Sequence, residues 1–325
     1  MSSKDQSKQL ENKAGTNPRK SFFYRLCRHK TALFSLCTVL IFLLTALTVE
    51  IYAICAEYCD FTPAYELTSP ETFAPPSTEH IMGTDYMGRD CLLRAIGGIA
   101  TAVKVGVIAA LIAAAIGVTL GMLAGFYGGR LDSFVIWLYS TFAAMPTLLF
   151  ILAFALLFTR GYLAPELMAP VNFCAQALHT EPGMLAVYLA IGLTGWVTLC
   201  KVTRAETMKL RNQTFVQAAR VCGVSNVVII FRHILPNLMH LVIIYFTLRF
   251  AYAVMTEVLV SYLGLGVKSA PSWGIMISDG QERLWCGVWW EVTAATVFMF
   301  ILVLALNLLG DSLRDLLDPK SENRK

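Results

Sequence analysis

The feature that most constrains this chain is a series of long stretches without a charged side chain. Residues 105–129 and 133–159 contain no Asp, Glu, Lys or Arg. A helix of about 20 apolar residues crosses the hydrocarbon core of a bilayer, where backbone must satisfy its own hydrogen bonds. Charged residues make up 15% of the 325 residues and hydrophobic ones 56%, whereas about 25% of a soluble domain is charged. The sequence predicts an all-α integral membrane protein and argues against a soluble enzyme or a disulfide-stapled secreted domain.

Six apolar stretches are predicted as transmembrane helices, at residues 31–49, 105–129, 133–159, 183–200, 238–267 and 292–310. The distribution of Lys and Arg orients them, because cytoplasmic segments carry the excess of basic residues. With the N-terminus inside, nineteen of the 26 Lys and Arg fall in cytoplasmic segments and five in external ones. We therefore expect six transmembrane helices with both the N-terminus and the C-terminus cytoplasmic.

This topology divides the chain into segments with different roles. The division is a basic cytoplasmic segment (1–30), a first transmembrane helix (31–56), an external loop (57–103), a five-helix core (104–312) with a cytoplasmic loop (201–237), and a cytoplasmic tail (313–325). The first helix is expected to be a retained anchor, because its apolar run is longer than the core of a signal peptide. The only large internal loop is 201–237, so contacts with cytosolic partners are expected to pass through it.

The chain shows no motif for catalysis of its own. It has no phosphate-binding G-x-x-x-x-G-K-[ST] loop, no H-E-x-x-H and no G-x-S-x-G. His233 and His240 have helical spacing but no neighbouring acidic ligand, so no metal or cofactor site is expected. The net charge of +4 does not indicate nucleic-acid binding. We expect a protein that is not an enzyme.

The internal loop is predicted to contain a short helix with a small-residue face. Phe215, Ala218, Ala219 and Cys222 have the i, i+3, i+4, i+7 spacing of one helical face, and Gly223 offers a stop after it. Small side chains allow close approach to another protein. The alternative is an amphipathic helix at the lipid interface, which would carry bulkier apolar residues and more Lys.

Several motifs carry a family resemblance. Gln217-Ala218-Ala219, Gly223, His233 and Leu235-Pro236 resemble the E-A-A-x3-G-x9-I-x-L-P signature of permease subunits of ATP-binding-cassette importers, with Gln217 in place of Glu and His233 in place of Ile. Further segments are similar to the peptide branch, in particular to the second of the two unlike permeases of oligopeptide and dipeptide importers. They are residues 83–90 (GTDYMGRD), 257–267, 271–274 (PSWG) and 307–319.

The resemblance implies a mechanism in which the motor is another chain. The helix in the loop would be a coupling helix docked on a separate ATPase, with coupling residues Gln217, Ala218, Ala219, Gly223, His233, Leu235 and Pro236. The implied partners are a second homologous permease, two ATPase subunits that hydrolyse ATP, an extracytoplasmic substrate-binding protein, a peptide substrate and the lipid bilayer. The implied location is the bacterial cytoplasmic (inner) membrane.

Other residues are candidates for gating, packing or docking. Arg249 and Glu257 lie within the fifth predicted span, are costly in lipid and are expected to face protein or water. Pro146 predicts a static kink or a hinge in the third span. External segment 83–90 is interpreted as an ordered turn before an interfacial helix, and direct contact with the binding protein is a hypothesis for Gly83, Thr84, Asp85, Gly88, Arg89 and Asp90.

The repeated Gly117, Gly121 and Gly125 predict close helix packing, with a direct role in the path as the alternative.

Two alternatives to peptide import remain at this point. A related importer could carry nickel, glutathione or another small solute. A secondary transporter driven by an ion gradient would be favoured by several intramembrane carboxylates, of which this chain shows essentially Glu257.

Overall fold

The computed structural model describes residues 29–159, 165–266 and 270–317. The predicted basic segment up to residue 28 and the tail from residue 318 lie outside these ranges. The described part is helical, with isolated β-bridges as its other regular pairing. Its elements are α3 (Lys30–Cys59), α4 (Cys91–Tyr127), α5 (Gly129–Ala144), α6 (Thr147–Thr159), α7 (Pro165–Ala177), α8 (Pro182–Leu210), α9 (Thr214–Val221), α10 (Asn226–Val228), the π-helical turn η1 (Ile229–Ile234), α11 (Leu235–Tyr262), α12 (Trp273–Gln281), the 3-10 turn η2 (Leu284–Cys286) and α13 (Trp290–Leu317).

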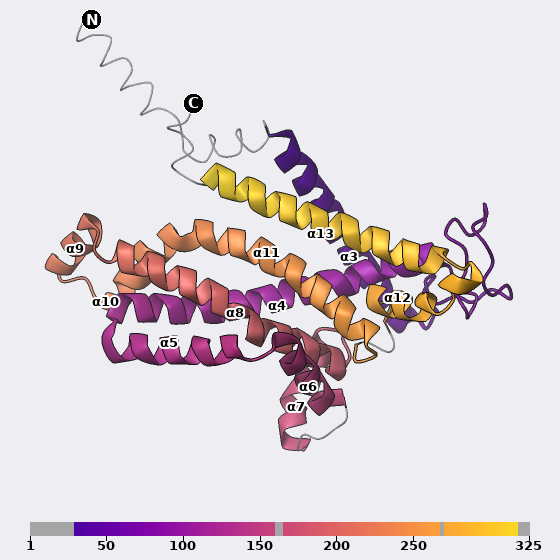
Figure 1. The fold of residues 1–325 in the computed structure, drawn as a ribbon, viewed down its shortest axis with the longest axis horizontal. Helices are drawn as coiled ribbons and strands as arrows, with labels where there is room; N and C mark the ends of the chain where they lie inside the picture. The colour runs from indigo at the N-terminus through magenta and orange to yellow at the C-terminus, as the bar shows by residue number, and fades with distance from the viewer. Residues whose placement is uncertain (1–28, 160–164, 267–269, 318–325) are drawn as a thin grey trace, which may run out of the picture.

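The long helices run along the longest dimension of the molecule, with α9 at one end and α12 at the other (Figure 1). Within the described residues, five helical segments are long and apolar enough to cross a membrane, where α10, η1 and α11 count as one segment. A bent pair, α5 with α6, brings the number to as many as six. The predicted all-helical membrane fold is confirmed at this level. Helices α7 and α12 were not predicted from the sequence.

The third predicted span is broken, which corrects the expectation of one kinked or hinged helix over residues 133–159. Helices α5 and α6 meet at an angle of 86°, and Met145 between them is extended, with φ −82° and ψ 136°. A proline disfavours the helical conformation of the residue before it, so Pro146 ends α5 and α6 begins at Thr147. Figure 1 shows α6 and α7 turned away from the long axis.

Helices α4 and α8 pack against each other along most of their length. A Cβ atom on Gly117, Gly121 or Gly125 would lie 2.9, 2.7 or 2.6 Å from the backbone oxygen of Trp196, Cys200 or Arg204, respectively. The four-residue spacing on α4 thus matches a four-residue spacing on α8. The three glycines pack two helix backbones together, as the small-residue pattern predicts.

The start of α4 lies earlier than the sequence suggested. Asp90 caps the helix, since its carboxylate accepts a hydrogen bond of 3.0 Å from the backbone N–H of Leu93. Residues 91–103, expected in the external loop, are therefore the first turns of a continuous 37-residue helix. The helix expected after segment 83–90 is therefore the beginning of α4.

Candidate functional site

Helix α9 is attached to the end of the bundle by one deeply buried side chain. Val216 is fully buried and belongs to an apolar cluster with Phe126 of α4, Ile230 of η1 and Leu238 of α11. The guanidinium of Arg220 adds a cation–π contact, 4.9 Å from the centre of the Phe126 ring. The short helix therefore has a fixed base where three membrane helices end.

Arg204 of α8 and Arg211, the C-cap residue that follows α8, connect that base to the neighbouring helices. Arg211 donates hydrogen bonds from Nη1 to the carbonyl oxygens of Gly125 (3.1 Å) and Phe126 (3.4 Å), in the last turn of α4. Arg204 forms a two-pronged ion pair with Asp132 of α5, in which Nη2 lies 2.6 Å from Oδ2. Helices α4, α5 and α8 are thus tied together next to α9.

The opposite face of α9 is exposed. It presents Phe215, Gln217, Ala218 and Cys222, together with Val221, which is 89% exposed. The predicted docking face is thus displaced: Ala219 packs partly against the buried cluster instead of lying on the outer face. Val216 and Val221 were not among the predicted coupling residues, although their five-residue separation on an eight-residue helix already places them on different faces.

Gly223 ends this element, as predicted. Its φ is +75°, a left-handed conformation that glycine adopts without strain. Its N–H donates to the carbonyl of Arg220 and the N–H of Val224 donates to that of Ala219, both at 3.0 Å. A Cβ atom at Gly223 would meet nothing within 4 Å, so the turn is open to the surroundings.

The second half of the signature lies in η1 and the first turn of α11. His233 is half-buried and its carbonyl accepts a 2.6 Å hydrogen bond from Asn237 Nδ2. Leu235 is half-buried, and Pro236 is exposed in the first turn of α11, where the missing N–H of proline costs nothing. Since Ile234 lies in the same buried cluster as Val216, the two halves of the signature are joined through the core.

At the other end of the molecule, residues 83–90 form a turn around one buried carboxylate. Asp85 is fully buried and accepts hydrogen bonds from Arg89 Nε (2.8 Å), Arg94 Nη1 (2.6 Å) and the backbone N–H groups of Met87 (2.8 Å) and Arg89 (2.9 Å). Thr84 is also fully buried; its Oγ1 donates to the carbonyl of Glu71 at 2.8 Å.

These positions correct the expected contact with a binding protein. Gly83, Thr84, Asp85 and Gly88 are buried in this chain, so they hold the turn and cannot form a contact surface. Arg89 and Asp90 remain half-exposed. The exposed residues of the turn are Tyr86 and Met87, which the sequence reasoning did not select.

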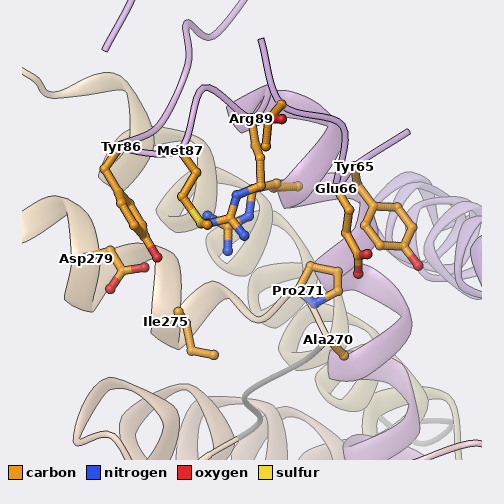
Figure 2. Close-up of a pocket in the computed structure, with 11 residues that line it drawn as sticks. Tyr65, Glu66, Tyr86, Met87, Arg89, Ala270, Pro271, Ile275 and Asp279 are labelled. Carbon is orange, nitrogen blue, oxygen red and sulfur yellow. The ribbon is translucent and has the colours of Figure 1, made fainter. Parts of the chain in front are cut away.

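Beside this turn lies a pocket of about 390 Å³. Figure 2 shows Arg89 extending into it, with Tyr86 and Asp279 on one side and Tyr65 and Glu66 on the other. Burial raises the pKa of the Asp279 carboxyl above its ordinary value. The pocket is lined by side chains of both charges and by apolar side chains.

Glu257 has its partners within this chain. It is 1% exposed, and its Oε1 accepts hydrogen bonds from Ser261 Oγ (2.6 Å) and Ser272 Oγ (2.9 Å). Ser272 also caps α12 by accepting from the N–H of Gly274. The acid therefore joins the end of α11 to the beginning of α12.

Arg249 lies near the middle of α11 and lines a second pocket, of about 370 Å³. The pocket also includes Thr147, the residue that follows Pro146, and Thr198 of α8. The candidate residues Pro146 and Arg249 are thus brought to one region, whereas Glu257 is buried away from it.

Comparison with known proteins identifies the family. Residues 117–323 match the family described as binding-protein-dependent transport system inner membrane component. The chain belongs to this family. The resemblance to permease subunits of ATP-binding-cassette importers is therefore confirmed, and the protein is a multi-pass permease of the inner membrane.

Relatives within this binding-protein-dependent family share most of the chain. The dipeptide transport system permease protein DppC of Bacillus subtilis is 32% identical over 76% of this chain and 70% of its own. The oligopeptide transport system permease protein OppC of Escherichia coli is 36% identical over 74% and 72%. The di/tripeptide transport system permease protein DppC of Pseudomonas aeruginosa is 31% identical over 94% of both chains. These relatives are transport permeases and not enzymes.

Proposed function

We propose that this chain is one of two unlike permease subunits of an importer that moves peptides inward using ATP hydrolysed by separate subunits. The observation that carries the proposal is the exposed face of α9, held on the buried Val216 base. Exposed Phe215, Ala218 and Val221 form an apolar surface with little bulk at Ala218. Such a surface suits docking into a groove of another protein.

The arrangement of the two ends supports a direction of transport. We place α9 and both termini on the cytoplasmic side, because the basic residues of 201–237 and of the terminal segments concentrate there. The opposite end, with Tyr86, Met87 and the pocket of Figure 2, would receive an extracytoplasmic binding protein. A second, homologous permease would complete the path.

Peptides are the proposed substrate because the relatives carry oligopeptide, dipeptide and di/tripeptide transport names. Competition by unlabelled di- to pentapeptides for uptake of a labelled peptide tests this directly. Competition by nickel or glutathione, with none by peptides, would replace the substrate and leave the importer mechanism intact.

Docking of α9 is tested with Ala218→Arg in the assembled importer. The variant adds bulk and charge to the exposed face without backbone strain, unlike a substitution at Gly223 with its φ of +75°. We expect normal insertion, loss of the ATPase subunits on co-purification and at least a tenfold loss of uptake, since an interface position that must exclude water tolerates a charge poorly.

Ala205→Arg is the matched control, because Ala205 is exposed on α8 and lies outside α9. It is expected to retain the ATPase subunits. Wild-type uptake by Ala218→Arg at normal protein level would remove the coupling assignment. Uptake that needs no ATPase and collapses with an ionophore would instead indicate a secondary transporter.

A further inference from the structure

Arg249 occupies an uncommon position for a cation. It is half-buried near the middle of α11, on a face shared with Tyr245, Leu248 and Tyr252 at i−4, i−1 and i+3. A charged side chain at the depth of the hydrocarbon core is costly, and it therefore faces a water-filled cavity or a partner. The pocket of about 370 Å³ provides the cavity.

The contacts of Arg249 within the described residues leave most of its hydrogen-bonding capacity unused. Its Nη2 donates to Thr198 Oγ1 at 3.4 Å, a long hydrogen bond. Its guanidinium carbon lies 5.2 Å from the centre of the Tyr252 ring. By contrast, Arg94, Lys104 and Arg204 each form an ion pair with a carboxylate of the chain.

Among the residues that the structure describes, the other polar groups lining the pocket add hydroxyls and no negative charge. They are Thr147 at the start of α6, Thr194 and Thr198 on α8, and Tyr245 and Tyr252 on α11. The break at Pro146 directs the first residue of α6 to this pocket, and the N-terminus of a helix is its positive end. A guanidinium fork among hydroxyls is suited to bind a carboxylate with two parallel hydrogen bonds.

We propose that this pocket binds the C-terminal carboxylate of the transported peptide. This inference rests on the proposed peptide function and adds a specific contact to it. A permease that carries peptides of different sequences can rely only on groups that all of them share: the backbone, the terminal ammonium and the terminal carboxylate. Glu257 does not offer the matching contact for the ammonium, because it is buried and hydrogen-bonded to two serines.

The test uses the complete importer with its binding protein in proteoliposomes. Uptake of labelled trialanine is compared with uptake of trialanine amide, each at a concentration that saturates the binding protein. We expect Arg249→Gln to lower the rate for the free acid about tenfold and to change the rate for the amide less than twofold, since a hydrogen-bonded charge pair is worth about one order of magnitude. The ratio of acid to amide uptake would then fall about tenfold.

The ratio of acid to amide uptake distinguishes loss of the carboxylate contact from loss of a folded transporter. Uptake of the amide reports on an intact path, and Arg130→Gln, at an exposed arginine outside the pocket, should leave the ratio unchanged. If Arg249→Gln does not assemble, Arg249→Lys decides: it keeps the charge, loses the fork and should lower the ratio about threefold.

Three results would overturn the inference. An equal loss for both peptides would assign Arg249 to an ion pair with the second permease. If the wild type takes up peptide and both Arg249 variants keep its ratio of acid to amide uptake, the carboxylate contact is excluded. The proposed peptide function would then still stand. A wild type that takes up neither trialanine, nor its amide, nor any other di- to pentapeptide would exclude the peptide function, and the inference with it.

Discussion

Asp85 shows how much one residue can organise. Four donors converge on its carboxylate, two from arginines and two from the backbone, and the glycines on both sides of it, Gly83 and Gly88, have positive φ. The sequence indicated an ordered turn at this place from its glycines and charges. The local sequence could not predict which side chains of the turn are buried. Their burial depends on Arg94, one helical turn into α4, and on residues 69–74, and both lie outside the 83–90 motif.

Replacing Asp85 by Asn should destabilise the end of the protein that contains the 83–90 turn. The change removes the counter-charge that Arg89 and Arg94 share, while Glu291 still lies 3.7 Å from Arg94. Removing one partner of a buried ion pair costs up to about 3–5 kcal/mol. Thermal unfolding of the purified permease complex would measure the loss as a lower Tm. Glu79→Gln is the control, since Glu79 is exposed. An equal Tm for Asp85→Asn and the wild type would show that the hydrogen bonds to the Asp85 carboxylate do not stabilise this turn.

At the level of elements, the periodicity of the sequence predicted which face of a helix packs closely. It did not predict which other helix packs against that face. The spacing of Gly117, Gly121 and Gly125 predicted a close-packing face on α4, and the structure adds that α8 fills it. The third span shows the opposite case. Pro146 predicted a disturbance, but whether the chain bends slightly or by 86° is decided by the packing of α6, which no local pattern contains. Helix α12 was missed because its nine residues include Gly274 and Gly280, and glycine is unfavourable inside a helix.

A leucine at Gly121 should force α4 and α8 apart. The Cβ atom alone would lie 2.7 Å from the carbonyl oxygen of Cys200, and backbone cannot yield as a side chain can. Overpacking of this kind costs about 1–3 kcal/mol or more, so the amount of folded complex and its Tm should both fall.

The comparison variant for this prediction is Ala115→Leu, which enlarges an exposed position of the same helix. It should leave the yield and the Tm close to the wild-type values. Equal effects of the two substitutions would show that the glycine face does not hold the helices together.

For the whole molecule, the sequence predicted the helical membrane architecture and the family. Which residues of α9 and of the 83–90 turn face outward became clear only from side-chain burial in the structure. Charge distribution favours one orientation because positive charge resists translocation. The chain carries its own reporters for this orientation: Cys222 beside α9 and Cys286 in η2 are both exposed, and Figure 1 places α9 and the neighbourhood of α12 at opposite ends.

Labelling of single-cysteine variants with a membrane-impermeant maleimide would test the orientation. Cys286 should react in intact cells, whereas Cys222 should react only after the membrane is opened. Cys200, which is buried, is the negative control in both conditions. Reaction of Cys222 in intact cells would reverse the proposed direction of the whole protein.

The hydrogen bonds that connect the end of α8 to the end of α4 also bear on how α8 can move. A 29-residue helix is about 43 Å long at 1.5 Å per residue, and Arg204 and Arg211 fasten it beside α9. If α8 pivots there as a stiff rod, a tilt of about 5° moves its far end by about 4 Å. Under the proposed coupling, we expect α8 to convert a small movement at α9 into a larger displacement at its opposite end.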